Sequence, residues 1–173
     1  NKSHPCQIIS DLFTLKEHFN NLNLNILWMG DFNNVCFSLI QAANLINELN
    51  LSVCVPEFLI SKINLPINKN IKIISNLDNE DLSIFECVMT DVFISMNDEN
   101  NLDKIELLNP YAVTSKLMKL TAPNSVFMHC LPARVGMEVE EEVFRGSKSI
   151  VWKQAYNRLI AQKNLLNLIY NNP

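Results

Sequence analysis

The chain has 173 residues, of which 48% are hydrophobic and 18% are charged, and its formal net charge is −4. This length and composition fit one globular domain with a substantial core, whereas the acidic balance argues against a general nucleic-acid binder, which would need a basic face. Because of this acidic balance, we expect a small substrate held by local charge. No apolar stretch approaches the roughly 20 residues of a membrane span.

The first half of the chain predicts helices that alternate with short strands. Residues 5–19 carry an apolar stripe at helical spacing, and Pro5 suits the first helical position, which leaves His4 at or near the N-cap. A buried strand over 25–30 and a helix over 34–48 follow. The alternation then repeats as a strand over 51–55, a short helix over 57–63, a strand over 71–75, a helical turn near 80–85 and a strand over 87–93.

The second half continues this pattern after a polar segment, 97–108, which we expect to be irregular and mobile. Beyond it we predict a helix over 111–120, a strand over 125–130, a helix over 138–144, a strand over 149–153 and a closing helix over 155–170. Strands that alternate with helices imply a parallel sheet covered on both faces. The predicted fold is therefore a doubly wound, Rossmann-like α/β domain with three layers, α/β/α.

Polar side chains gather at the carboxyl ends of the predicted strands, where open α/β sheets bind their ligands. The set comprises Asp31, Asn33 and Asn34 after the first strand, Asp91, Ser95 and Met96 around the end of the fourth, His129 and Cys130 at the end of the fifth, and Arg158 at the opening of the last helix. Their convergence indicates a binding site at this edge of the sheet.

Four of these residues also have a purely structural interpretation. Asn33 is equally well explained as a helix N-cap, since Asn is favoured there. Asp91 stands among apolar residues, where a carboxylate needs either a ligand or a partner such as a salt bridge. From the residues alone, Cys130 is best explained as an inert buried thiol and Arg158 as part of a solvated helix face.

The sequence His4-Pro5-Cys6-Gln7 stands at the expected start of the first helix. Helix N-termini offer unpaired N–H groups and the positive end of the helix dipole, so they receive anions and polar carbonyls. His4 can donate to a carbonyl oxygen there, and Gln7 can accept from an amide.

The five cysteines form an odd number without regular spacing, and they include no CxxC pair. This pattern favours reduced thiols in a cytosol or organelle matrix over a disulfide framework. We expect no metal ion and no organic cofactor.

Taken together, these segments resemble the aspartate/ornithine carbamoyltransferase family, and its ornithine branch in particular. Five motifs occur in the family's order along nearly the whole chain: His4-Pro5-Cys6-Gln7 for HPxQ, Trp28 to Val35 for W-x-G-D-x-N-N, Thr90 to Met96 for T-D-x-[WF]-x-S-M, His129-Cys130-Leu131-Pro132 for HCLP, and the closing segment that ends in Asn157-Arg158. The HCLP cysteine and the S-M segment favour ornithine as the acceptor.

The resemblance implies transfer of a carbamoyl group from carbamoyl phosphate to L-ornithine, which yields citrulline and phosphate. It assigns carbamoyl-phosphate binding to His4, Gln7, Cys130, Leu131 and Arg158, ornithine binding to Asn34, Asp91, Ser95, Met96, Cys130 and Leu131, and catalysis to Asp91, Cys130 and Arg158. It further implies a homotrimer in arginine biosynthesis, in the cytoplasm or an organelle matrix, with no nucleic-acid or membrane partner.

The family's S-T-R-T motif, which binds the phosphate in a preceding domain, is absent from this chain. We therefore interpret residues 1–20 as an interdomain helix, 21–173 as the ornithine-binding domain, and the N-terminal carbamoyl-phosphate domain as a partner outside this chain. Smaller departures from the motifs are Phe32 and Asn97, which replace glycines, Tyr156, which replaces a glutamate, and the altered segment 133–136.

Two alternative functions stay open at this point. One is a carbamoyltransferase for another amine, although Asp91 and Ser95 speak against putrescine, which has no α-amino or carboxylate group to hold. The other is a non-catalytic amino-acid-binding remnant of the same fold.

Overall fold

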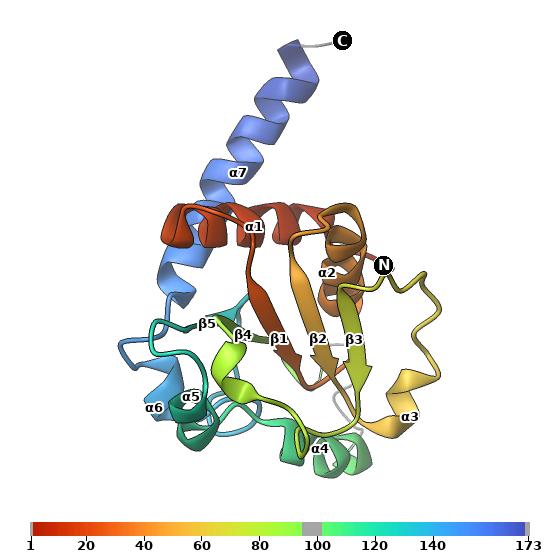
Figure 1. The fold of residues 1–173 in the computed structure, drawn as a ribbon. Helices are drawn as coiled ribbons and strands as arrows, with labels where there is room; N and C mark the ends of the chain where they lie inside the picture. The colour runs from red at the N-terminus through yellow and green to blue at the C-terminus, as the bar shows by residue number, and fades with distance from the viewer. Residues whose placement is uncertain (1, 95–101, 172–173) are drawn as a thin grey trace.

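Five parallel strands form the centre of the molecule in the order β3-β2-β1-β4-β5, shown in Figure 1. Their bounds are Asn25–Met29 for β1, Asn50–Cys54 for β2, Ile71–Ile74 for β3, Cys87–Thr90 for β4 and Val126–His129 for β5. The computed structural model describes residues 2–94 and 102–171. Because the chain leaves β1 toward β2 and later returns to pair β4 with its other edge, the strand order reverses at β1, and such switch points are where these sheets bind ligands.

Helices cover both faces of the sheet, which confirms the predicted three-layer α/β fold (Figure 1). Helices α1 (Pro5–Phe19) and α2 (Asn34–Leu45) pack on one face, and α5 (Ser115–Leu120), α6 (Glu141–Phe144) and the start of α7 (Val151–Asn171) pack on the other. The shorter elements are α3 (Glu57–Ile60), α4 (Leu102–Leu108), and the 3-10 turns η1 (Leu82–Ile84) and η2 (Asn109–Tyr111).

Strand β1 shows why the strands read as continuous apolar runs. Ile26 and Trp28 face the core beneath α1 and α2, whereas Leu27 and Met29 face the opposite core. All four side chains are at most 3% exposed. Since successive side chains of a strand point to opposite faces, a strand covered on both sides needs apolar residues throughout.

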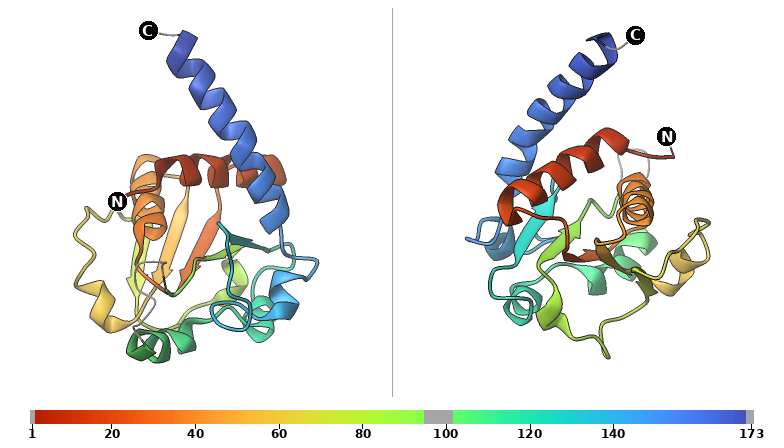
Figure 2. Two further views of the ribbon diagram at one scale, coloured as in Figure 1. Left: turned by 180° about the vertical axis from the view of Figure 1, so that it is seen from behind. Right: turned by 45° about the horizontal axis from the view of Figure 1, so that its top comes forward.

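Helix α7 crosses α1 and then projects well beyond the rest of the domain, as both views in Figure 2 show. Its exposed apolar side chains include Leu159, Leu166 and Ile169. None of the helices in the described ranges, α7 included, is long and apolar enough to cross a membrane.

Two predicted elements were wrong. The strand over 149–153 does not form: Ser149 makes only an isolated bridge to Phe127, and α7 already begins at Val151, so Arg158 lies about two turns inside that helix rather than at its start. Within the segment predicted to be irregular, 102–108 is helix α4, whereas 97–101 lies outside the described residues. The helices predicted over 34–48, 57–63, 111–120 and 138–144 are each shorter than expected.

Gly30 connects β1 to the candidate site in a conformation that side chains rarely adopt. Its φ is +113°, and a Cβ atom there would stand 2.7 Å from Cε1 of Phe93 and 3.3 Å from the Thr90 hydroxyl oxygen. Both neighbours are buried, so neither can withdraw easily.

We expect Gly30→Ala to lower the free energy of unfolding by roughly 2–4 kcal/mol, since backbone strain and overpacking act together. The matched control is Gly136→Ala, because Gly136 has φ +89° but nothing within 4 Å of its added Cβ. That variant should lose only about 1 kcal/mol from strain. Urea unfolding of both variants measures the difference, and equal losses would contradict the steric argument.

Candidate functional site

A cavity of about 300 Å³ opens where β1, β4 and β5 end. Polar groups from five segments of the chain reach it, among apolar side chains. The lining residues are His4, Asn34, Val35, Asp91, Val92, Ile94, Cys130, Leu131, Pro132, Arg134 and Arg158. The carboxyl ends of the strands and the start of α1 therefore meet in one pocket.

Asp91 directly follows the last residue of β4 and is only 8% exposed. Its Oδ2 accepts a hydrogen bond from Nδ2 of Asn33 at 2.7 Å, and its Oδ1 accepts from the backbone N–H of Val92 at 2.8 Å and from Sγ of Cys130 at 3.0 Å. No salt bridge to Asp91 occurs in the described ranges, so three neutral donors hold this carboxylate. Its negative charge stays available to a cationic ligand.

Cys130 follows β5 and donates its thiol proton toward Asp91. Burial raises the pKa of this thiol well above its usual range, and the neighbouring charge of Asp91 adds to that effect. The residue is thus a neutral thiol near pH 7 and not the thiolate that a cysteine nucleophile would require. The next residue, Leu131, has a positive φ of 57° and precedes a cis peptide bond to Pro132.

The buried side chains of His129 and Glu138 hold the turn at Leu131 in place. The backbone N–H of Leu131 donates to Nδ1 of His129 at 2.9 Å, and Nε2 of His129 lies 3.3 Å from Oε1 of Glu138. Because Nδ1 accepts a hydrogen bond, Nε2 is the ring nitrogen that carries the proton when the imidazole is neutral. Asp91, His129 and Cys130 have ligand-type atoms within 4.8 Å of one another, but both nitrogens of His129 are engaged, so this trio offers a metal ion no imidazole lone pair.

The turn after β1 resolves the two interpretations of Asn33. Its Oδ1 accepts from the backbone N–H groups of Val35 and Cys36 and so caps α2, while its Nδ2 donates to Asp91. Asn33 is both a helix cap and a holder of the site carboxylate. Its neighbour Asn34 lines the cavity.

Two polar or bulky residues of this turn point elsewhere. Asp31 binds Nζ of Lys104 on α4 at 2.7 Å and does not line the cavity. The ring of Phe32 packs against Phe37, with centroids 6.5 Å apart, and is likewise not among the lining side chains. The bulky residue at position 32 therefore leaves the cavity open.

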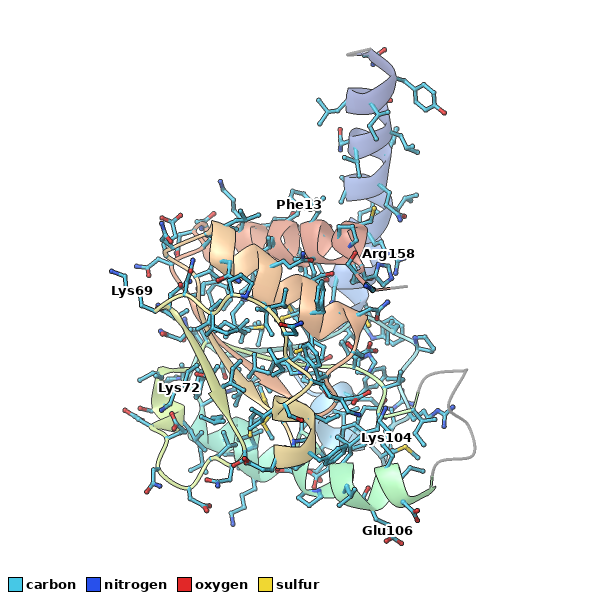
Figure 3. The ribbon with its side chains drawn as sticks, turned by 90° about the vertical axis from the view of Figure 1, so that its right-hand side faces the viewer. Phe13, Lys69, Lys72, Lys104, Glu106 and Arg158 are labelled. Atoms are coloured by element: carbon cyan, nitrogen blue, oxygen red, sulfur yellow. The ribbon has the colours of Figure 1, made fainter. Side chains whose placement is uncertain are left out.

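Arg158 and His4 form a second part of the cavity lining. Arg158 lies on α7 beside the beginning of α1, as Figure 3 shows, and its Nη1 donates to Oε1 of Gln7 at 2.7 Å. His4 is the N-cap of α1, and its backbone N–H donates to the hydroxyl of Ser38 at 2.7 Å. Burial and the nearby Arg158 lower the pKa of the His4 imidazole, so it is neutral at pH 7 and can donate from one nitrogen.

Gln7 contacts Arg158 from the side away from the cavity and does not line the cavity itself. It is 1% exposed, and its Nε2 donates to Oδ1 of Asp11 at 2.7 Å. Nε2 of Gln154 donates to the same oxygen at 2.8 Å. Burial raises the pKa of Asp11 to about 7, although both amide hydrogen bonds act in the opposite direction.

The structure brings together most residues that the sequence singled out. His4, Asn34, Asp91, Cys130, Leu131 and Arg158 line one cavity, and Gln7 contacts Arg158 from behind. Ser95 and Met96 lie outside the described residues. Sequence reasoning missed Arg134, which lines the cavity, and the hydrogen bond from Asn33 to Asp91, since nothing in the sequence pairs residues 58 positions apart.

Comparison with known proteins identifies the family to which this architecture belongs. A sequence model described as "Aspartate/ornithine carbamoyltransferase, Asp/Orn binding domain" matches residues 22–169. The chain belongs to the aspartate/ornithine carbamoyltransferase family. The cavity described above therefore lies in a domain whose family description names aspartate or ornithine binding.

Individual members of the family match nearly the whole chain. The chain is 40% identical to the ornithine carbamoyltransferase of Rhodopseudomonas palustris (strain BisA53), covering 95% of this chain and 54% of that protein. It is 39% identical to the ornithine carbamoyltransferase of Aquifex aeolicus, covering 100% of this chain and 59% of that one. The crystal structure of ornithine carbamoyltransferase from Pyrococcus furiosus superposes with a TM-score of 0.84 at 30% identity, over 99% of this chain and 57% of that chain. The chain thus spans little more than half the length of these relatives.

The neutral state of the Cys130 thiol leads to a chemical prediction. At pH 7 to 8 Cys130 should react with iodoacetamide at least about tenfold more slowly than glutathione, since its pKa lies well above the usual range and the thiolate is the reactive form. Asp91→Asn should raise the rate, because the charge that disfavours the thiolate is removed. Peptide mass spectrometry measures the modification, and a rate equal to that of glutathione would contradict the assignment.

Proposed function

We propose that this chain is the acceptor-binding part of an ornithine carbamoyltransferase, which converts carbamoyl phosphate and L-ornithine to L-citrulline and phosphate. The observation that carries the proposal is the meeting of unlike groups in one cavity. Its lining presents the Asp91 carboxylate, without a salt bridge in the described ranges, together with Arg158 and the neutral His4.

Asp91 and its surroundings suit the amino-acid substrate. A carboxylate held by neutral donors favours an ammonium group, because Oδ2 accepts only one hydrogen bond, from Asn33, and keeps a second lone-pair site for a cationic donor. We assign the α-ammonium group of ornithine to Asp91 and further backbone and side-chain contacts to Asn34, Leu131, Ser95 and Met96. Cys130, beside Asp91, then lies near the reacting end of the side chain.

Arg158, Gln7 and His4 suit the carbamoyl group. In the reaction the δ-amine of ornithine forms a bond to the carbamoyl carbon, negative charge develops on the carbonyl oxygen, and the tetrahedral centre expels phosphate with the electrons of the broken C–O bond. A fixed guanidinium and a neutral imidazole donor stabilise that oxygen. The δ-ammonium must first lose a proton, and we assign its acceptor to the Asp91 carboxylate beside Cys130. The second proton, which the attacking nitrogen loses as the C–N bond forms, leaves with the phosphate.

The positioning of two substrates side by side supplies the larger part of the acceleration in our proposal. It requires a firm hold on the phosphate, and the S-T-R-T motif that provides this hold in the family is not in the chain. We assign it to an N-terminal carbamoyl-phosphate domain, consistent with relatives nearly twice as long.

The surface of α1 and α7 supports such a neighbouring domain. A groove of about 230 Å³ between the two helices is lined almost entirely by apolar side chains, among them Ile9, Phe13 and Leu165. Phe13 and Arg158 lie on the side from which α7 projects, as labelled in Figure 3. We therefore treat residues 1–20 as an interdomain helix and 21–173 as the ornithine-binding domain. By analogy with the family we place the assembled enzyme as a homotrimer in arginine biosynthesis, in the cytoplasm or an organelle matrix.

Ornithine binding tests the acceptor site in the chain itself. Calorimetry should detect L-ornithine binding, and Asp91→Ala should weaken it at least about tenfold, since a hydrogen bond to a charged group contributes roughly 1.5–3 kcal/mol. Asp78→Ala, at an exposed aspartate that does not line the cavity, is the matched control and should bind normally. Equal affinity for putrescine would favour another amine acceptor, and no binding at all would indicate a non-catalytic remnant.

Transfer tests the assignment of Arg158. Mixing the chain with the N-terminal half of the Rhodopseudomonas palustris relative should yield citrulline, whereas the chain alone should not. Arg158→Ala should lower the rate at least about a hundredfold, the usual effect of removing a donor to a developing oxyanion. Arg145→Ala removes an exposed arginine at the C-cap of α6 and should leave the rate unchanged. Equal rates for the two variants would refute the role of Arg158.

A further inference from the structure

Asp11 has no part in the chemistry proposed above, yet it occupies the centre of a buried chain of hydrogen bonds. It lies on the inner face of α1 and is 1% exposed. Its Oδ1 accepts from Nε2 of Gln7 at 2.7 Å and from Nε2 of Gln154 at 2.8 Å. Its Oδ2 is buried without a hydrogen-bond partner.

The outer ends of the two glutamines fix which way each amide points. Oε1 of Gln7 accepts from Arg158 at 2.7 Å, and Oε1 of Gln154 accepts from the backbone N–H of His129 at 2.9 Å. A guanidinium and a backbone N–H can only donate, so each meets an amide oxygen and turns the amide nitrogen inward. The group between the two amides must therefore accept twice, and a carboxylate does so.

The two arms end at two separate parts of the cavity lining. One arm reaches Arg158, which lines the cavity. The other reaches the last residue of β5, immediately before Cys130 and Leu131, which also line it. A single oxygen of Asp11 therefore connects α1, α7 and β5 behind the site.

We propose that Asp11 is a positioning residue that sets the Arg158 guanidinium through Gln7 and the backbone before Cys130 through Gln154, and so fixes the spacing of these two parts of the cavity lining. The consequence for catalysis rests on the function proposed above, whereas the structural coupling does not.

The energetics argue against a role in stability alone. Among the described residues the buried Asp11 carboxylate makes no direct ion pair, and one of its oxygens accepts no hydrogen bond. Such burial is costly, and it raises the pKa of Asp11 to about 7. The charged groups that act on it are Arg158 and Asp91, both of which line the cavity. An apolar residue at this position of α1 would pack without that cost, and local violations of this kind are typical of functional sites.

The two arms can be tested separately in the 173-residue chain by NMR and by thiol modification. In the unaltered chain the side-chain amide protons of Gln7 and Gln154 should exchange slowly with solvent. Asp11→Ala should make both exchange at least tenfold faster, whereas Asp11→Asn should retain protection, because both hydrogen bonds go to the one oxygen that Asn keeps.

Gln154→Met cuts only the arm to β5, and Gln7→Met only the arm to Arg158. We expect Gln154→Met to raise the iodoacetamide rate of Cys130 several-fold. Gln7→Met should not raise it, because it releases only Arg158, whose charge favours the thiolate. This pair keeps the proposal testable if Asp11→Ala does not fold. Unchanged amide exchange in a folded Asp11→Ala chain, or equal Cys130 rates in the two methionine variants, would overturn the proposal.

A kinetic arm tests the consequence for transfer in the two-part enzyme. Asp11→Ala should lower kcat at least tenfold with a KM for ornithine within about threefold of normal, and Asp11→Asn should restore most of kcat. The losses from Asp11→Ala and Gln7→Ala should multiply only in part in the double variant, since both act through Arg158 and only Asp11 also acts through Gln154. Fully multiplied losses would overturn the positioning role. Absence of citrulline with the unaltered chain would instead refute the proposed function and leave the amide-exchange test in force.

Discussion

The carboxylate of Asp91 is the constraint around which the edge of the sheet is arranged. It follows β4 and accepts three hydrogen bonds. The donors are Asn33 in the turn after β1, the backbone N–H of the next residue, Val92, and Cys130 in the turn after β5. A buried carboxylate is tolerated only where donors surround it, so these turns must converge. Gly30, Asn33 and the support of Leu131 by His129 serve that convergence. Because the donors are neutral, the charge itself is left for whatever binds.

Much of this arrangement could be predicted from the sequence. The alternation of apolar strands with helices specified the sheet, and ligand binding at strand ends placed Asp91 and Cys130 at one edge. The strand over 149–153 was wrong because Val151 begins α7 and packs in the core that includes Val143 and Phe144. The hydrogen bond between Arg158 and Gln7 could not be predicted either, because the two residues are 151 positions apart and a contact between two helices leaves no periodic signal in the sequence.

The departures from the family motifs fall into two groups. Phe32 and Tyr156 are accommodated outside the cavity, the first against Phe37 and the second at 64% exposure on α7. Arg134 belongs to the altered segment 133–136 but lines the cavity, so it places a third arginine-or-histidine group there beside Arg158 and His4. The altered segment therefore reaches the cavity lining, whereas the groups that hold Asp91 belong to Asn33, Val92 and Cys130.

The projection of α7 has a consequence for local stability. The helix has 21 residues, and its last turns expose Leu166, Ile169 and Tyr170 to between 53% and 79% while including the weak helix formers Asn164, Asn167 and Asn171. A helix end that packs against little depends on its own backbone bonds and opens at low free energy. In the isolated chain this end should fray many times more often than the turns that carry Gln154 and Arg158. A partner that covered the exposed end of α7 would keep the last turns of this helix ordered.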